Sequence, residues 1–161
     1  MAGKWYFAGQ ELQDRTGHAV GRQLLQQLYA QHVGGDMPQV QIAHGGKPVF
    51  VDSPWHFSIS HTKRHAFCVL ADHPVGLDAE EADRQIDLRL ASSVLSPGEK
   101  KQFDTAADQR KALLTFWVLK EAEGKLTGKG VGWHPRHTDF LLPDARVWEV
   151  DGCILALMEE M

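Results

Sequence analysis

The sequence has few cysteines and no long apolar segment. Its two cysteines, Cys68 and Cys153, lie in the apolar stretches AFCVLA and GCILAL. We therefore expect two buried thiols in a reducing compartment, not a disulfide framework. No apolar run approaches the roughly 18 residues that a membrane span needs, and the N-terminal residues lack the apolar core of a secretory signal. These absences predict a cytoplasmic protein without a membrane partner.

The sequence also lacks an excess of basic charge and a recognisable zinc pattern. It contains 17 Lys and Arg against 21 Asp and Glu, which leaves a net charge of −4, so no general field attracts nucleic acid. The nine histidines are scattered, with no HExxH motif and no cysteine partners at zinc spacing. His61 and His65 flank a predicted turn, which is weak evidence for a two-histidine metal site. We expect most histidines to make surface or polar contacts.

What the sequence does contain is a regular alternation of apolar and polar residues. Its 161 residues are 43% hydrophobic and 24% charged, enough for one globular unit or two small lobes. The first expected element is a helix over 14–31, and the same helical spacing predicts helices over 87–95 and 107–127. A capping box at Ser96 predicts a further short helix that ends near Phe103. Strands are expected over 39–43, 49–51, 56–61, 66–72 and 75–80, with two or three more among 138–143, 146–150 and 152–159. Because helices and antiparallel strands mix without βαβ alternation, the predicted fold class is α+β.

Two carboxylates stand two residues apart in the predicted strand 75–80. Asp78 and Glu80 leave the same face of such a strand, and Asp78 lies among apolar residues, where an unpaired carboxylate is costly. Ligands that offer only oxygen favour Mg²⁺ over zinc. The alternative is an edge strand that carries solvated acids, because surface carboxylates are common. These residues alone do not decide between the two.

A second group of charged residues lies on the predicted helix within FWVLKEAEGKLTGKG. Trp117, Glu121 and Lys125 are four residues apart and share one face, and Lys120 flanks it. Taken alone, this pattern describes an ordinary amphipathic helix with a Glu121–Lys125 pair. Together with the two strand carboxylates, it suits a Mg²⁺ ion bound to a phosphate or pyrophosphate.

A third group consists of Ser60 and His61 at a strand end and Lys47 in a Gly-Gly-Lys turn. A strand end and a glycine turn can both present hydrogen-bond donors to a phosphate. Without an acidic partner nearby, Ser60 and His61 are weak evidence for a nucleophilic dyad. Each of the three is, singly, more typical of a structural residue.

Four motifs in a fixed order relate the chain to a known family. Residues 76–80 match G-(I/V/L)-D-x-E and residues 117–125 match W-x-x-K-E-A-x-x-K, while 57–62 match F-(N/S)-(I/L)-S-H-(S/T) and 46–48 match G-K-P. Over about residues 14–158 the sequence therefore resembles the 4′-phosphopantetheinyl transferases of the larger, Sfp-like type.

The resemblance implies two similar α/β lobes in a pseudo-twofold arrangement, residues 1–73 and 74–161, within one monomer. Coenzyme A would lie between them, and Mg²⁺ (or Mn²⁺, which oxygen ligands do not distinguish) would be held by Asp78, Glu80 and Glu121. The serine of an apo acyl or peptidyl carrier protein would attack the β-phosphate of coenzyme A and release 3′,5′-ADP. Relative to the family, the N-terminal lobe is expected to lack the strands and helix that precede its arginine-bearing helix.

The resemblance also assigns individual roles. Glu121 would be the general base, directly or through a metal-bound water, and Lys125 would neutralise or protonate the leaving phosphate. Coenzyme A would be bound by a set of polar residues that includes two arginines of the first helix: Lys47, Ser60, His61, Lys120, Lys125, Arg15 and Arg22.

Carrier proteins are usually acidic, so a basic surface is expected where they dock. Four basic residues between the two metal motifs are candidates: Lys100, Lys101, Arg110 and Lys111. A solvated helical face explains them equally well. Two other functions stay open, a non-catalytic module that binds coenzyme A or a carrier, and a Mg²⁺-dependent nucleotide hydrolase.

Overall fold

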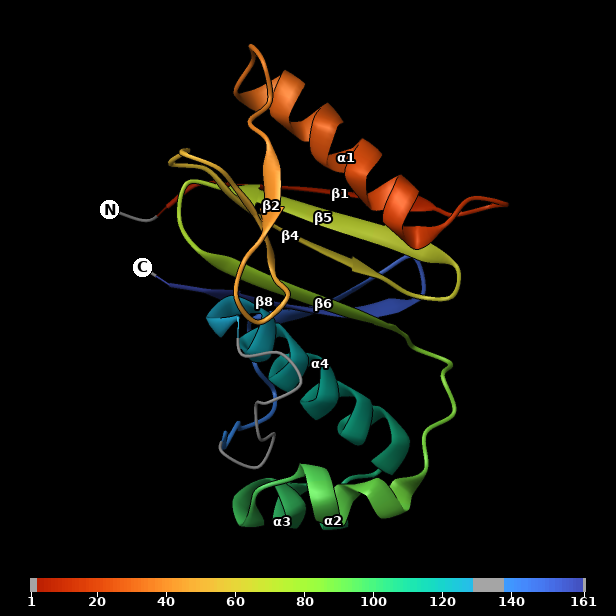
Figure 1. Ribbon diagram of the computed structural model, residues 1–161. Helices are drawn as coiled ribbons and strands as arrows, with labels where there is room; N and C mark the ends of the chain where they lie inside the picture. Colours follow the sequence, from red (N-terminus) through yellow and green to blue (C-terminus); the bar gives the residue numbers. More distant parts are fainter. Residues whose placement is uncertain (1–2, 129–137, 161) are drawn as a thin grey trace.

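Two antiparallel sheets of three strands each, both covered by a long helix, dominate the described part of the chain (Figure 1). The computed structural model describes residues 3–128 and 138–160. The first sheet has the order β1-β5-β4, from Trp5–Glu11, His65–Ala71 and His56–His61. The second has the order β6-β8-β7, from Val75–Glu81, Cys153–Glu159 and Val147–Val150. A small hairpin of β2 (Val40–Ile42) and β3 (Pro48–Phe50) precedes β4.

The two sheets and their helices repeat one topology. In the first repeat, β1 is followed by helix α1 (Gly17–His32) and then, after the hairpin, by β4 and β5. In the second, β6 is followed after several short helices by α4 (Gln109–Thr127), and then by β7 and β8. In both repeats the last strand lies in the middle of its sheet. This combination of helices with antiparallel sheets confirms the predicted α+β class.

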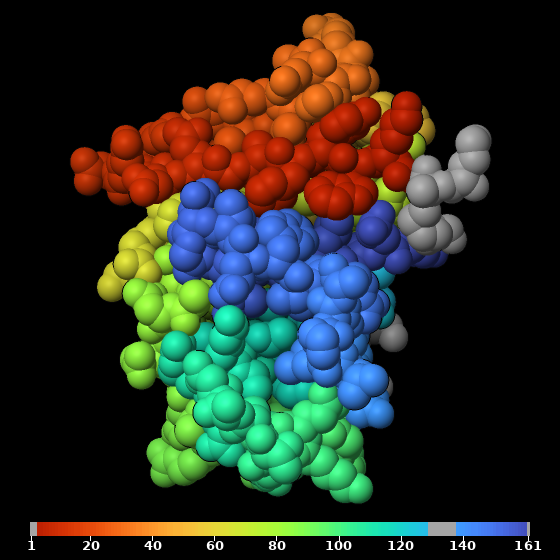
Figure 2. Space-filling model, turned by 180° about the vertical axis from the view of Figure 1, so that it is seen from behind, coloured from red at the N-terminus to blue at the C-terminus, as the bar shows by residue number. Residues whose placement is uncertain are grey.

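The repeats stack as layers of helix, sheet, sheet and helix. Helix α1 packs on the outer face of the first sheet through Val20, Leu24 and Leu28. Apolar side chains of β5, β6 and β8 fill the space between the sheets, and α4 covers the other face of the second sheet. Figure 2 shows the same stacking from behind, with β1 in red between α1 and the C-terminal strands in blue. Alternate residues of β6 therefore face the first sheet and α4.

Local signals account for most helix ends. The Thr16 side chain accepts a hydrogen bond from the Ala19 N–H at the start of α1, and the predicted capping box of Ser96 and Glu99 is present at the start of α3 (Pro97–Thr105). Helix α4 ends at Gly128, whose φ of 73° suits glycine. The predicted helix over 87–95 is a 3₁₀ turn at Leu88–Leu90 followed by α2 (Ala91–Val94).

One expectation about the elements is wrong. Strand β1 precedes α1, so the helix is not the first element, and WYFAGQE forms a strand because it pairs with β5 from Trp5 to Glu11. Of the two or three strands expected after residue 137, two form, β7 and β8, and residues 138–143 are the segment that forms none. Backbone N–H groups of this segment donate to side chains of α3 instead. The Phe140 N–H donates to Glu99 and the Leu142 N–H donates to Gln102. None of the helices in the described residues is long and apolar enough to cross a membrane.

Candidate functional site

The candidate site lies where helix α4 crosses strand β6. A Cβ atom at Gly76 would overlap the Ala122 carbonyl oxygen and the Leu126 nitrogen, so glycine allows the backbones of α4 and β6 to touch. The contacted residues of α4 directly follow Glu121 and Lys125, and Gly76 stands two residues before Asp78. It explains why a glycine stands before the strand carboxylates.

Strand β4 joins β6 through serine hydroxyls. The Leu77 N–H donates to Ser58 Oγ at 3.0 Å, and the Ala79 N–H donates to Ser60 Oγ at 3.0 Å. Ser60 Oγ also donates to Asp78 Oδ1 at 3.3 Å. The two serines of FSISH therefore satisfy edge N–H groups of β6 and bring β4 to the site.

Asp78 is buried, at 7% exposure, and only partly paired. Lys125 Nζ lies 3.2 Å from its Oδ1, whereas Oδ2 is buried without a hydrogen-bond partner among the residues that the structure describes. Burial raises the pKa of Asp78 to about 6 against the opposing charge of Lys125, and Glu80 and Glu121 add to the rise. Burial also raises the pKa of Glu121, opposed by Lys125 and assisted by Glu80. The three predicted carboxylates thus act on one another across β6 and α4.

This arrangement fits a hard divalent cation. The donors are all carboxylate oxygens, which Mg²⁺ prefers, and the unpartnered Asp78 Oδ2 is an atom that a cation would satisfy. A cation would also offset the repulsion among the carboxylates. These donors are compatible with such an ion, and the assignment of Asp78, Glu80 and Glu121 as its ligands stays a prediction.

Arg84 is a charged neighbour of this group that the sequence analysis did not name. Its Nη1 lies 2.6 Å from Glu80 Oε1. The only sequence signal is its position four residues after Glu80, just beyond the strand end. Arg84 and Lys125 balance part of the negative charge of these carboxylates.

Two lysines tie the neighbouring elements to the site. Lys125 Nζ donates to the Ile59 carbonyl of β4 at 3.4 Å. Lys47 Nζ donates to the carbonyls of Val75 at 3.1 Å and Leu126 at 3.4 Å, and burial lowers its pKa. The glycine turn thus reaches the start of β6 and the end of α4, beside the candidate site.

Lys120 faces away from the carboxylates. Its side chain is fully buried, with Nζ 2.6 Å from Glu99 Oε1 and 2.7 Å from Thr138 Oγ1. Glu99 also accepts the backbone N–H groups of Ser96 and Phe140. In this structure Lys120 therefore holds α3 and the segment after residue 137 onto α4, and it is not brought to the expected phosphate site.

The remaining expected coenzyme A residues belong to α1 and the end of β4. His61 is exposed and packs against Gly17, where a Cβ would overlap its ring. Arg15 precedes α1, not within it as expected, and its Nη1 bonds Gln23 Oε1 at 2.6 Å. Arg22 lies in α1 and is partly exposed. Their roles toward coenzyme A stay predictions.

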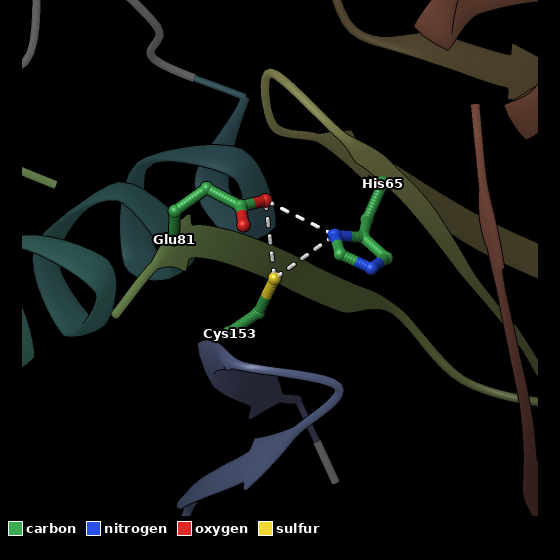
Figure 3. Close-up of side chains that lie close together, drawn as sticks. All are labelled: His65, Glu81 and Cys153. Atoms are coloured by element: carbon green, nitrogen blue, oxygen red, sulfur yellow. Dashed lines mark hydrogen bonds and ion pairs between the residues drawn. The ribbon is translucent and has the colours of Figure 1, made fainter. Parts of the chain in front are cut away.

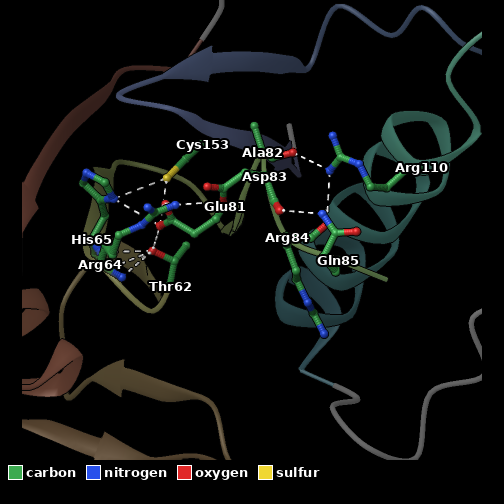
Figure 4. Close-up of polar contacts among 10 residues, drawn as sticks. All are labelled: Thr62, Arg64, His65, Glu81, Ala82, Asp83, Arg84, Gln85, Arg110 and Cys153. Carbon is green, nitrogen blue, oxygen red and sulfur yellow. Dashed lines mark hydrogen bonds and ion pairs between the residues drawn. The ribbon is translucent and has the colours of Figure 1, made fainter. Parts of the chain in front are cut away.

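The four basic candidates for carrier docking do not form one free surface. Lys100 pairs with Asp104 at 2.7 Å and Lys111 with Glu149 at 3.5 Å. Arg110 donates to the carbonyls of Ala82 and Arg84 (Figure 4). Lys101 on α3 is exposed and stays the best placed of the four.

Comparisons with known proteins agree with this geometry. Residues 74–153, which include β6, α4 and the three carboxylates, match the sequence model of the 4′-phosphopantetheinyl transferase superfamily. The chain is 35% identical over 88 residues to the 4′-phosphopantetheinyl transferase gsp of Aneurinibacillus migulanus, and 33% identical over 124 residues to psf-1 of Bacillus pumilus, which carries the same description. It is 29% identical over 140 residues to the 4′-phosphopantetheinyl transferase HetI of Nostoc sp..

These matches differ in how much of each protein they cover. The match to gsp covers 53% of this chain and 36% of gsp, and the match to psf-1 covers 73% of this chain and 50% of psf-1. The match to HetI covers 81% of this chain and 57% of HetI. The chain therefore spans about half the length of the relatives that it matches.

Proposed function

Because the chain belongs to the 4′-phosphopantetheinyl transferase superfamily, we propose that it transfers the 4′-phosphopantetheine arm of coenzyme A to a serine of an apo acyl or peptidyl carrier protein. The observation that supports this best is the meeting of two motifs in space. The strand motif around Asp78 and the helix motif around Glu121 pack through Gly76, with a buried carboxylate oxygen that needs a partner.

The proposed site binds a divalent cation through Asp78, Glu80 and Glu121. When bound, Mg²⁺ neutralises the pyrophosphate of coenzyme A and favours its correct placement; Mn²⁺ is the alternative ion. Lys47 and Lys125 supply further positive charge beside the carboxylates. Ser60, His61, Arg15 and Arg22 stay proposed contacts of the nucleotide end on the family resemblance.

The reaction needs positioning and charge neutralisation more than covalent help. The carrier serine Oγ bonds to the β-phosphorus of coenzyme A, and the bond from that phosphorus to the bridging oxygen breaks. The serine proton passes to Glu121, and the leaving phosphate of 3′,5′-ADP is neutralised by Lys125. The phosphopantetheine arm stays on the carrier. Both carboxylate motifs and both lysines come from one chain, so we propose that a monomer holds the site.

Two further proposals concern setting and partner. Two free, buried thiols suit a reducing compartment such as the cytoplasm. An acidic carrier would dock on α3, where Lys101 is exposed. The ion pair with Asp104 is made by the neighbouring Lys100.

The proposal is tested by intact-mass analysis of apo carrier proteins mixed with coenzyme A, Mg²⁺ and the purified chain. We expect a carrier to gain one phosphopantetheine group, and chelation by EDTA to abolish the gain. Glu121→Gln should lose transfer by more than about 100-fold. Glu123→Gln is the matched control on the same helix, because Glu123 acts electrostatically on Arg146, not on Asp78, and it should keep full activity.

Other outcomes identify the competing functions. Release of ADP without any gain on a carrier would indicate a nucleotide hydrolase. Coenzyme A binding without turnover on any carrier would indicate a binding module.

A further inference from the structure

A group of three side chains with metal-ligating atoms lies on the opposite face of β6 from Asp78 and Glu80. It consists of His65 on β5, Glu81 on β6 and Cys153 on β8 (Figure 3). The thiol is fully buried, and the histidine and glutamate are each 7% exposed. The three residues therefore meet between the two sheets, at the end of the strands where β6 leaves the second sheet.

The donor atoms have the spacing of a metal site. His65 Nδ1 lies 3.1 Å from Glu81 Oε2, Cys153 Sγ lies 3.3 Å from the same oxygen, and Sγ lies 3.5 Å from Nδ1. Zinc binds sulfur at about 2.3 Å and nitrogen or oxygen at about 2.0–2.1 Å, so neighbouring ligands of a tetrahedral ion lie about 3.3–3.6 Å apart. The three sides of the observed triangle are within a few tenths of an ångström of these values. The observed spacing therefore suits a tetrahedral ion.

The surroundings hold the carboxylate in place and connect it to solvent. Arg64 binds the other oxygen of Glu81, with Nε at 2.9 Å and Nη2 at 2.8 Å from Oε1, and Thr62 donates to Oε2 (Figure 4). Such outer contacts orient metal ligands in known sites. A surface groove of about 470 Å³ borders the group at Glu81, beside Thr62 and Arg64, whereas His65 and Cys153 are not among its lining residues. The carboxylate side of the group is therefore the side nearest to solvent.

The donor types select the ion. A thiolate, an imidazole and a carboxylate together are typical of Zn²⁺ and unsuitable for Mg²⁺, which prefers oxygen. The thiolate and the carboxylate together match the charge of a divalent ion, and the positive charge of Arg64 beside Glu81 is offset by Asp83. Binding would replace the present hydrogen bonds: Cys153 releases its thiol proton to solvent, and neutral His65 carries its ring proton on Nε2.

We propose that His65, Glu81 and Cys153 form a Zn²⁺ site, with a water as the fourth ligand. The ion links β5 of the first sheet to β6 and β8 of the second, so it fastens the two repeats together. The three ligands lie on the opposite face of β6 from Asp78 and Glu80, and the proposal does not depend on the transferase function.

The experiment measures Co²⁺ binding to the untagged, reduced protein, with Mg²⁺ in excess to occupy oxygen-only sites. We expect one ion per chain, a sulfur-to-cobalt charge-transfer band in the near ultraviolet and the intense visible bands of a four-coordinate ion, all removed by one equivalent of Zn²⁺. Cys153→Ala should lose the charge-transfer band. The matched control is Cys68→Ala, which removes the other fully buried thiol and should keep the band.

The Cys68→Ala protein also keeps the test decisive if Cys153→Ala fails to fold, because Cys153 is then its only thiol. A charge-transfer band in that variant shows that the sulfur ligand is Cys153. Absence of the band in both the wild type and Cys68→Ala would overturn the proposal and leave a purely hydrogen-bonded group. A band that survives in folded Cys153→Ala would overturn it as well.

A second readout does not depend on cobalt. Zn²⁺ should raise the midpoint temperature of thermal unfolding of the wild type, since a ligand that binds only the folded state stabilises it. Glu81→Gln keeps the shape of the side chain but loses the anionic ligand, and should show little or no rise. An equal rise in both proteins would place the bound zinc elsewhere, for example on surface histidines, and refute the site.

Discussion

At the scale of single residues, Asp78 combines deep burial with incomplete pairing. One of its oxygens contacts Lys125 and Ser60, and the other has no hydrogen-bond partner among the described residues. A buried polar atom in this state costs free energy, and the raised pKa of Asp78 reflects that cost. The same atom is what a cation would bind, so we infer that stability is given up here for function.

This inference predicts opposite effects of Asp78→Asn on activity and stability. Transfer to a carrier should fall by more than about 100-fold, because even outer-shell partners of metal ligands are worth 10- to 100-fold. The free energy of unfolding, measured with urea in EDTA, should stay the same or rise, because a neutral amide is cheaper to bury. A clear loss of stability would mean that the activity loss reports damage to the fold instead.

At the scale of elements, the site depends on how closely α4 lies on β6. The contact is made at Gly76, against the α4 backbone at Ala122 and Leu126. A side chain at this position would push the helix away from the strand. Glu121 and Lys125 would then move relative to Asp78, and both packing and chemistry would suffer.

Gly76→Ala should therefore lower the free energy of unfolding by about 3 kcal/mol and abolish transfer. The control is Gly35→Ala, which has open space around it but a φ of 72°, so its cost of about 1 kcal/mol arises only from the backbone. Urea unfolding of both variants provides the comparison. Equal costs would show that α4 can shift freely over β6.

Helix α3 has its own prediction, since Lys101 is the exposed member of the basic group. Lys101→Glu should raise KM for an acidic carrier several-fold and leave KM for coenzyme A unchanged. Lys4→Glu, a charge reversal at another exposed lysine near the N-terminus, should alter neither constant. Steady-state kinetics with each substrate varied in turn would decide, and identical behaviour of the two variants would remove α3 from the docking surface.

At the scale of the whole molecule, His73 connects the end of one repeat to the end of the other. Its Nδ1 lies 2.8 Å from Asp72 Oδ1 and its Nε2 lies 2.7 Å from Glu159 Oε1. Asp72 also accepts the backbone N–H of Lys4 at 3.0 Å. Burial lowers the pKa of His73, but the bonds to Asp72 and Glu159 outweigh it and leave the pKa raised above 6.5.

A raised histidine pKa has a definite effect on stability. The folded state holds the proton more tightly than the unfolded state, so the stabilisation is complete below pH 6.5 and declines as the pH rises through the folded pKa. His73→Gln should remove this decline from the pH dependence of the unfolding free energy. His18→Gln, at an exposed position of α1, should retain it. A wild-type profile that rises across the same range would contradict the assignment.

The sequence by itself determined what depends on neighbours along the chain. The capping box at Ser96, the helical spacing of α4 and the alternation that puts Asp78 and Glu80 on one face are local, and all are found in the structure. The motifs built from them also identified the family. Such features are predictable because their interactions span only a few residues.

The tertiary structure decided what depends on pairing over long distances. Strand β1 forms because β5 pairs with it, and Lys120 turns to Glu99 because α3 packs on that side of α4. Among the proposed zinc ligands, His65 and Glu81 are 16 residues apart along the chain, Glu81 and Cys153 are 72 apart, and His65 and Cys153 are 88 apart. Only the stacking of two sheets in one register places them side by side, and no spacing rule along the sequence encodes that arrangement.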